Sequence, residues 1–231
     1  MKKLKLLAVA LGLLTVTSAA FAIPTQTLYI TDGSGISVIA STTTGLQTLT
    51  GSDGFWSVVV STGTSYPPLT GQGSVNAPVM DVSITATSLS GSGANPLKVF
   101  WGSSDFGPTS GSFNALFSGH VVAGTGQTVT YGTYYSTANN LPIVGNGLNG
   151  ASTLTSLLTM SPSTYSGSAS GGPLTLASPY SIIQAVTING GTPGGSYSLD
   201  ASLTTVPDGG TTVMLLGAAL SGLALLRRKI A

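Results

Sequence analysis

Short stretches in which apolar and polar residues alternate recur along most of this chain, and they limit its fold more than any other feature does. In residues 81–89, Val82 and Ile84 fall on one side and polar residues lie between them. The same alternation occurs in residues 112–120 and 196–203. A period of two residues is typical of a β-strand with one buried face. The pattern therefore predicts a fold built from half-buried strands.

Seven further segments have the composition of strands: 28–31, 36–41, 55–61, 97–101, 127–135, 164–168 and 180–189. Clusters of Gly, Asp, Asn and Pro separate the segments, and these residues supply the backbone conformations of tight turns. Several short strands at such spacing predict an all-β fold, an antiparallel β-sandwich or jelly-roll-like single domain. For residues 152–160 the choice between strand and helix stays open, because the leucines there also fit a helical period.

The composition excludes several classes of protein. The chain has 231 residues, of which 6% are charged and none is Cys. Without Cys there are no disulfide bonds and no thiolate ligands for a metal. Residues 23–206 contain one Lys and five Asp. A domain with so little positive charge lacks the basic surface that binds the phosphates of nucleic acid, so nucleic acid is excluded as a partner.

The residues from which catalytic and metal sites are built are scarce. His120 is the single histidine and the chain has no Glu, so a two-histidine metal site is excluded and a catalytic triad would need His120 as its base. This residue ends an alternating segment and is expected on the surface. Residues 145–150 have the spacing of a dinucleotide-binding motif, but the acidic residue expected about 20 positions later is missing. We therefore expect no catalytic residue, no cofactor, no metal and no enzymatic activity.

Several Asp and aromatic residues have structural interpretations. Asp32 and Asp53 precede glycines and are expected to accept hydrogen bonds from their own turns. Trp56 and Trp101 lie within strand segments and are expected in the core. The candidate surface for contact with a glycan consists of three tyrosines: Tyr131, Tyr134 and Tyr135.

The first 22 residues have the layout of a secretory signal peptide. Three Lys precede an apolar run at residues 6–16, and Ala20 and Ala22 form a small-residue cleavage site. We expect a signal helix that directs export through the Sec translocon. Cleavage by signal peptidase after Ala22 would leave a mature chain that begins at Ile23.

The last 26 residues, 206–231, combine three elements in order. The first is a short motif made of Val206, Pro207, Asp208, Gly209 and Gly210. The second is an apolar run at residues 212–226, and the third is a basic membrane stop made of Arg227, Arg228 and Lys229. As a helix, the 15-residue run spans about 22 Å, which is short against a hydrocarbon core of about 30 Å. The basic cluster favours a cytoplasmic C-terminus. The sequence thus predicts a short transmembrane helix that holds an extracellular domain, residues 23–205, at the membrane.

This arrangement resembles the PEP-CTERM sorting signals of bacterial surface proteins, in the variant that reads V-P-D-S-G. Gly209 stands where that variant has Ser, which leaves the class of the motif open. The resemblance implies recognition by an exosortase, a membrane-embedded cysteine transpeptidase, which cleaves near the motif and transfers the protein from a transient inner-membrane anchor. Residues 178–207 are also similar to the last strand pair of exported domains that precede such signals.

Together these features predict the location of the protein better than its ligand. We expect a non-enzymatic, structural protein of the cell surface or extracellular matrix that is associated with exopolysaccharide. The alternative is a carbohydrate-binding module that uses the three tyrosines.

Overall fold

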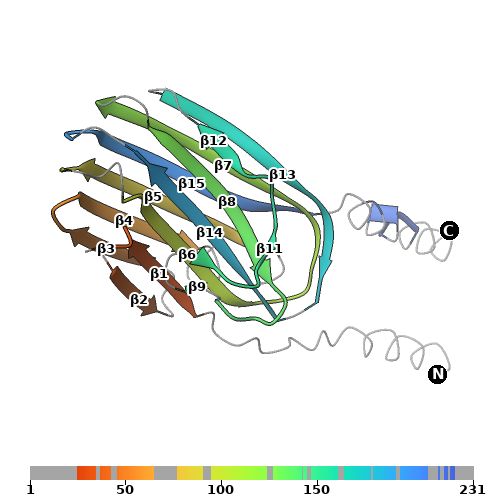
Figure 1. Ribbon diagram of the computed structural model, residues 1–231. Coiled ribbons are helices and arrows are strands. Elements are labelled where there is room, and N and C mark those ends of the chain that lie inside the picture. The colour runs from red at the N-terminus through yellow and green to blue at the C-terminus, as the bar shows by residue number, and fades with distance from the viewer. Residues whose placement is uncertain are drawn as a thin grey trace, which may run out of the picture.

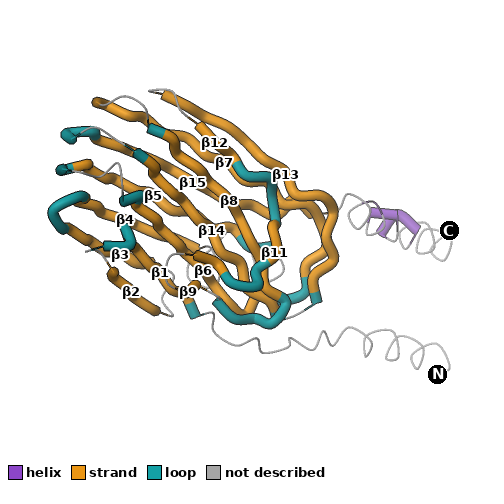
Figure 2. The backbone as a smooth tube through the Cα atoms, in the orientation of Figure 1, coloured by secondary structure: helices purple, strands orange, loops and turns teal. Residues whose placement is uncertain are grey.

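Two antiparallel β-sheets lie face to face and enclose the core (Figure 1). The computed structural model describes these residues: 25–34, 37–42, 46–64, 77–90, 95–123, 127–141, 143–144, 147–160, 164–177, 179–190, 193–207, 213, 216–217 and 219–221. Strands account for most of this part of the chain, and loops connect them at both ends of the sheets (Figure 2). The all-β class and the antiparallel sandwich were predicted from the sequence and are confirmed.

The first sheet has the strand order β11-β8-β14-β6-β1-β2, and β12 also pairs with β8. Its strands are β1 (Gln26–Thr31), β2 (Ser37–Thr42), β6 (Leu97–Phe106), β8 (Thr128–Ser136), β11 (Ser152–Thr153), β12 (Leu158–Met160) and β14 (Tyr180–Asn189). A separate short hairpin joins β9 (Ile143–Val144) and β10 (Gly147–Leu148). The hairpin is not part of the seven-stranded layer, which we call the first sheet.

The second sheet has the order β13-β7-β15-β5-β4-β3. Its strands are β3 (Leu46–Ser52), β4 (Trp56–Thr64), β5 (Val79–Ser88), β7 (Thr109–Ala123), β13 (Thr164–Leu176) and β15 (Ser196–Pro207). From β5 onward, each long strand is followed in the chain by one in the opposite sheet. In this part of the chain the long strands that pair within a sheet are therefore distant in sequence, so their pairing depends on the whole body folding together.

Aromatic side chains fill the space between the sheets. The ring of Phe117 stacks on Tyr131 from the other sheet, with centroids 5.1 Å apart, and also packs against Tyr165 at 5.7 Å. Gly119 leaves room for this group, because a Cβ atom there would lie 2.7 Å from the Tyr165 ring. Each such pair adds about 0.5–1.5 kcal/mol beyond the burial of its apolar area.

The two tryptophans are fully buried, as their positions in strand segments predicted. Trp56 and Trp101 are both 0% exposed. The Trp56 ring lies 5.7 Å from that of Tyr197, and its Nε1 donates to the carbonyl oxygen of Asn95 at 2.7 Å. A buried tryptophan whose N–H has an acceptor contributes its apolar area without leaving a polar group unsatisfied.

Polar side chains also cross the core. The Tyr131 hydroxyl donates to Gln184 Oε1 at 2.6 Å, and Thr133 and Thr155 share a hydrogen bond of 2.7 Å between their hydroxyls. Burial raises the pKa of Tyr131 far above its ordinary value, and the Asp81 carboxylate adds to this shift. The tyrosine therefore stays a neutral donor at every physiological pH.

The loops at the two ends are held by side-chain carboxylates and amides. Asp53 Oδ1 accepts from the backbone N–H groups of Phe55 and Trp56 at 2.7 and 2.8 Å, and Asp32 Oδ1 accepts from Ser34 at 2.9 Å. Both predicted Asp turns are confirmed. At the opposite end of the sheets, Asp105 and Asn139 are joined by two hydrogen bonds of 2.7 and 2.8 Å. Both have positive φ, 62° and 53°, a conformation that the paired side chains hold in place.

Every segment predicted as a strand lies within or overlaps a strand of the structure. Several strands are longer than predicted, and β3, β9 and β10 were not predicted at all. Residues 152–160 form β11, a bend and β12, which decides the open choice in favour of strand. The predicted domain boundary at residue 205 falls inside β15, which continues to Pro207.

The two terminal helices that the sequence predicts are not shown. The signal helix, residues 1–22, lies outside the described residues. Of the predicted transmembrane run, the described positions 213, 216–217 and 219–221 are helical. Among all described residues, no helix has the length and apolarity that crossing a membrane requires.

Replacing the buried tyrosine tests whether the polar link in the core stabilises the fold. We expect Tyr131→Phe to lower the free energy of unfolding by about 1–3 kcal/mol, because the buried Gln184 carboxamide loses its donor. For a chain of this size the melting temperature would fall by roughly 2–4 °C per kcal/mol. Thermal and urea unfolding, followed by fluorescence of the two buried tryptophans, would measure the change.

Tyr134→Phe is the matched control, since Tyr134 is only half-buried. It should change the free energy of unfolding by less than about 0.5 kcal/mol. An equal loss in both variants would contradict the role given to the Tyr131 hydroxyl.

Candidate functional site

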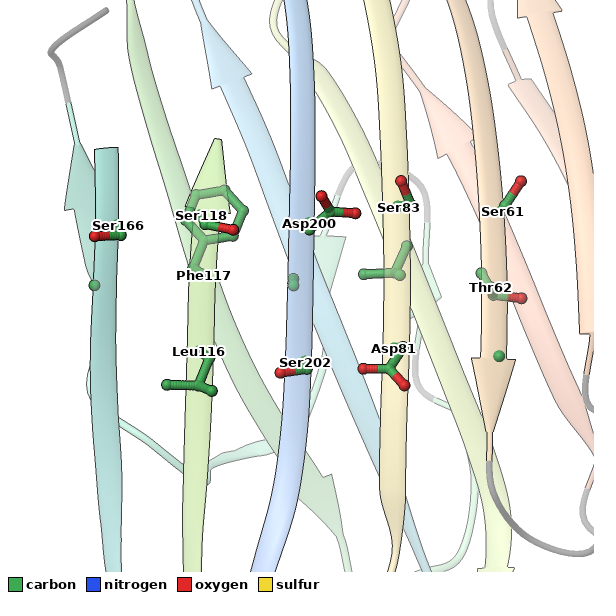
Figure 3. A pocket seen from close by; sticks show the side chains of 14 residues that line it. Ser61, Thr62, Asp81, Ser83, Leu116, Phe117, Ser118, Ser166, Asp200 and Ser202 are labelled. Atoms are coloured by element: carbon green, nitrogen blue, oxygen red, sulfur yellow. The ribbon is translucent and has the colours of Figure 1, made fainter. Parts of the chain in front are cut away.

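A groove crosses the outer face of the second sheet. It has a volume of about 680 Å³ and is lined by residues of β4, β5, β15, β7 and β13. The side chains at its surface that Figure 3 labels are Ser61, Asp81, Ser83, Leu116, Ser118, Ser166, Asp200 and Ser202. The groove is the candidate functional site of the described part of the chain.

A row of hydroxyl and carboxylate groups runs across the groove. The strand register places Thr48, Ser61, Ser83, Asp200, Ser118 and Ser166 side by side on six consecutive strands. We call these six residues the hydroxyl row, and Figure 3 shows five of them in line. At about 4.8 Å between neighbouring strands, the row is roughly 24 Å long. Ser and Thr of this row alternate along each strand with the side chains of the core, which is why they all face outward.

The adjacent row differs in character. It places Asp81, Ser202, Leu116 and Ser168 side by side. Leu116 is 47% exposed, so an apolar side chain lies in the middle of a polar face. Its position beside the hydroxyl row gives the groove both hydrogen-bonding groups and a small apolar contact surface.

Two carboxylates lie on neighbouring strands of the groove. Asp81 on β5 is opposite Ser202 on β15, and Asp200 is two residues away on the same strand. Partial burial and the nearby Asp200 carboxylate raise the pKa of Asp81. Because the folded state then holds this proton more tightly than the unfolded chain does, the contribution of Asp81 to stability rises as the pH falls through its folded pKa.

The chemistry of the groove suits an uncharged ligand rich in hydroxyl groups. A serine or threonine hydroxyl both donates and accepts hydrogen bonds, so the row can pair with either group of such a ligand. The lining contains two carboxylates and no Lys or Arg. Anionic ligands would meet repulsion from both carboxylates and find no cation.

The three tyrosines predicted as glycan contacts do not form one surface. Tyr131 is 1% exposed and its ring stacks on Phe117 in the core, so the prediction of an exposed ring is wrong for this residue. Tyr135 is partly buried against the core from the same sheet. Tyr134 points to the outer side of the first sheet, where it and the exposed Leu157 lie over Gly132.

The other residues considered in the sequence occupy plain structural positions. His120 is exposed on β7 between Ser198 and Thr164 of the neighbouring strands, as its place in the alternation predicted. The motif at 145–150 contains β10, part of a short hairpin. Within the described residues no three His, Cys, Asp or Glu side chains are grouped so as to hold a metal ion.

Most residues of the predicted targeting segments lie outside the described part. These are Ala20, Ala22, Ile23, Asp208, Gly209, Gly210, Arg227, Arg228 and Lys229. Val206 and Pro207 are described, and they are the last two residues of β15. The first part of the sorting motif thus belongs to the second sheet.

The sequence signal for the groove was present but incomplete. Alternation alone puts Asp81 and Ser83 on the outer face of one strand, and Asp200 and Ser202 on the outer face of another. Nothing in the sequence indicates that β5 pairs with β15, because the two strands are more than 100 residues apart. The sequence therefore did not predict that their outer side chains form one surface. The five Asp scattered along residues 23–206 gave no reason to single out this pair.

A known sorting motif matches the C-terminal end. Residues 205–230 match the VPDSG-CTERM motif, a variant of the PEP-CTERM-like exosortase signals. The predicted resemblance is confirmed for this segment, and it supports export to the cell surface. No curated protein matches the chain.

Solved structures show only distant likeness. Eiger TNF from S. frugiperda is 15% identical at a TM-score of 0.22, over 43% of this chain and 61% of that one. The adhesin domain of Epf from Streptococcus pyogenes is 10% identical at 0.31, over 57% and 46%. The CBM22-1 xylan-binding domain of Xyn10C from Paenibacillus barcinonensis is 12% identical at 0.26, over 78% and 94%. This chain spans less than two thirds of the first two, and all three TM-scores are too low to carry an argument.

The electrostatic coupling across the groove can be measured directly. We expect Asp200→Asn to lower the pKa of Asp81 towards its ordinary value, because the variant removes the neighbouring negative charge. A titration of the Asp81 carboxyl carbon by NMR in both proteins would show the shift. Asp32→Asn, at a turn outside the groove, should leave the titration of Asp81 unchanged. An unchanged pKa in Asp200→Asn would mean that the two carboxylates do not interact.

Proposed function

We propose that this chain, which ends in a VPDSG-CTERM motif at residues 205–230, is an exported protein that an exosortase processes and places on the cell surface or in the extracellular matrix. The proposal combines the motif with the signal peptide expected at residues 1–22. In the proposed pathway the Sec translocon exports the chain, and signal peptidase cleaves before Ile23. The apolar C-terminal run then holds the protein in the inner membrane until the exosortase acts. The basic residues 227–229 keep the tail in place during that interval.

In this proposal the β-sandwich has a structural role and associates with exopolysaccharide. The observation that supports it is the hydroxyl row, which offers donors and acceptors at strand spacing over roughly 24 Å, with five of its six residues in the groove lining. A long polymer can lie across several strands at once, and many weak contacts then add up along its length. The lack of cations in the groove favours a neutral polymer over an acidic one.

The proposed role is non-enzymatic. His120 faces outward one row away from Asp200 and is not part of the groove lining. The Asp81 and Asp200 carboxylates are the groups on which an alternative, hydrolytic role would rest, because sugar hydrolysis uses a pair of carboxylates around the scissile bond. A fall in polymer length on incubation with the protein would favour that alternative.

A second candidate surface is the outer side of the first sheet around Tyr134. Its ring lies beside the exposed Leu157 over Gly132, so it offers a small apolar platform. The alternative function is a carbohydrate-binding module that stacks sugars on Tyr134; Tyr135, the next residue of β8, faces the core and would not share this platform. The two surfaces lie on opposite faces of the sandwich, and single substitutions distinguish them.

Blocking the groove should weaken binding to a polysaccharide. We expect Ser118→Tyr, at the fifth of the six positions of the hydroxyl row, to raise the Kd for a neutral polysaccharide by at least roughly tenfold, which corresponds to about 1.4 kcal/mol. Affinity electrophoresis and a glycan array with neutral, acidic and amino polysaccharides would give the ligand class and the change.

Ser110→Tyr is the matched control, because Ser110 lies on the same strand and face but outside the groove lining. It should bind as the parent does. If Tyr134→Ala abolishes binding and Ser118→Tyr does not, the tyrosine surface is the site and the groove proposal is wrong.

The sorting motif itself is tested by changing its fixed residues. Pro207→Ala with Asp208→Ala should leave export intact but block processing, because the motif loses its rigid φ and its single charge. In cells that carry an exosortase, the variant should accumulate at full length in the membrane fraction, as judged by mass. Normal maturation of this variant would mean that these two residues are not required for sorting.

A further inference from the structure

The sorting motif begins inside the folded domain. Val206 pairs with Ser112 and Pro207 pairs with Gly111, both on β7, so the first two residues of the motif are the last two of β15. β15 is an inner strand, with β7 on one side and β5 on the other. The motif is therefore continuous with a strand that the sheet holds from both sides.

The contacts at this end of β15 are specific. The Thr205 backbone N–H and its Oγ1 both donate to the carbonyl oxygen of Pro78, at 3.2 and 3.1 Å. Since Thr205 directs its N–H towards Pro78, the alternation along a strand directs the N–H of Val206 towards Ser112 on β7. Hydrogen bonds on both sides thus restrain the residues that enter the motif.

Little chain separates this strand from the apolar run. Only residues 208–211 lie between Pro207 and the start of the run at Thr212, and four extended residues reach at most about 14 Å. An enzyme that takes an extended peptide needs the hydrogen-bonding edges of that peptide free. The backbone groups of Val206 are occupied by the pair with Ser112 on β7, and the folded sandwich is too bulky to enter an enzyme cleft together with its strand.

We propose that the end of β15 is a latch: the exosortase acts on a form in which residues 205–207 have separated from Pro78 and β7, so that Thr205 and Ser112 set the rate of processing. The inference rests on the proposed sorting function. The ends of strands open at lower free energy than the whole domain does. By the same alternation the backbone groups of Pro207 face away from β7, so its pair with Gly111 is a non-hydrogen-bonded one at the very end of β15, and separation begins there.

The latch predicts that weaker contacts at the strand end speed up processing. Thr205→Val keeps the β-branched shape but removes the hydroxyl donor to Pro78. When opening is fast relative to cleavage, the rate follows the population of the open form, and loss of one such hydrogen bond raises that population by roughly fivefold. Ser112→Pro removes the N–H that faces Val206 and should raise the rate further. Neither substitution alters the motif at 206–210.

The measurement is a pulse-chase of the full-length chain in cells that carry an exosortase, with the processed fraction followed by mass. Thr85→Val is the matched control, since Thr85 is an exposed threonine on the neighbouring strand β5, and it should be processed at the rate of the parent. Tryptophan fluorescence in the absence of urea should show that Thr205→Val is folded as completely as Thr85→Val. Hydrogen exchange on the full-length chain should be faster at Val206 than at Ala201 in the middle of β15.

The outcomes separate the latch from the sorting function. If the parent is processed and both Thr205→Val and Ser112→Pro are processed at its rate, the latch is wrong and the sorting function stands. Slow exchange at Val206, equal to that at Ala201, would also overturn the latch. If the parent is not processed at all while an exosortase is present, the sorting function fails, and the latch fails with it.

Discussion

Apolar packing between the two sheets is the interaction on which the rest of this structure depends. The chain has no Cys and few charges, so neither disulfides nor ion-pair networks share the task. The rings of Phe117 and Tyr131 stack between the two sheets, and the Tyr131 hydroxyl donates a hydrogen bond to Gln184. This polar link fixes one arrangement of the rings, because any other would leave a buried carboxamide without its donor. The flat outer face of the second sheet exists because its inner face is packed in this way.

The core and the outer face of the second sheet differ in the side chains that they contain. Large rings, including Trp56, Trp101 and Tyr131, are withdrawn into the interior. The groove is left with short hydroxyl side chains, two carboxylates and Leu116. A site of this kind cannot rely on stacking, so the sugar binding proposed for it would have to come from many hydrogen bonds at regular spacing. Such contacts are weak one at a time and add up only on a ligand that is itself long and repetitive.

The sequence predicted the local features of this fold well and the long-range ones poorly. Alternation located the strands, and Asp53 beside Gly located a turn, because both depend on neighbouring residues. The strand order, the paired carboxylates Asp81 and Asp200, and the Asp105 contact with Asn139 depend on residues 34 or more positions apart, and no local pattern carries that information. Tyr131 was misplaced because its aromatic neighbourhood suggested exposure, although its alternation with Thr130 and Gly132 was equally compatible with an inward position.

The short distance between β15 and the C-terminal run also determines how the domain would stand on a cell. In the proposed membrane-held form, only residues 208–211 lie between β15 and the apolar run, so a tether of at most about 14 Å restricts how far the sandwich can tilt from an orientation with its strands upright. The loops at the end of the sheets away from Pro207, which include the turns at Asp32 and Asp53, would then face away from the membrane. The hydroxyl row would lie parallel to the cell surface, at the height of Asp200, about 24 Å above Pro207 along the strand. Neighbouring copies attached in the same way would hold their grooves in one plane, as a continuous layer on which a single polymer could rest.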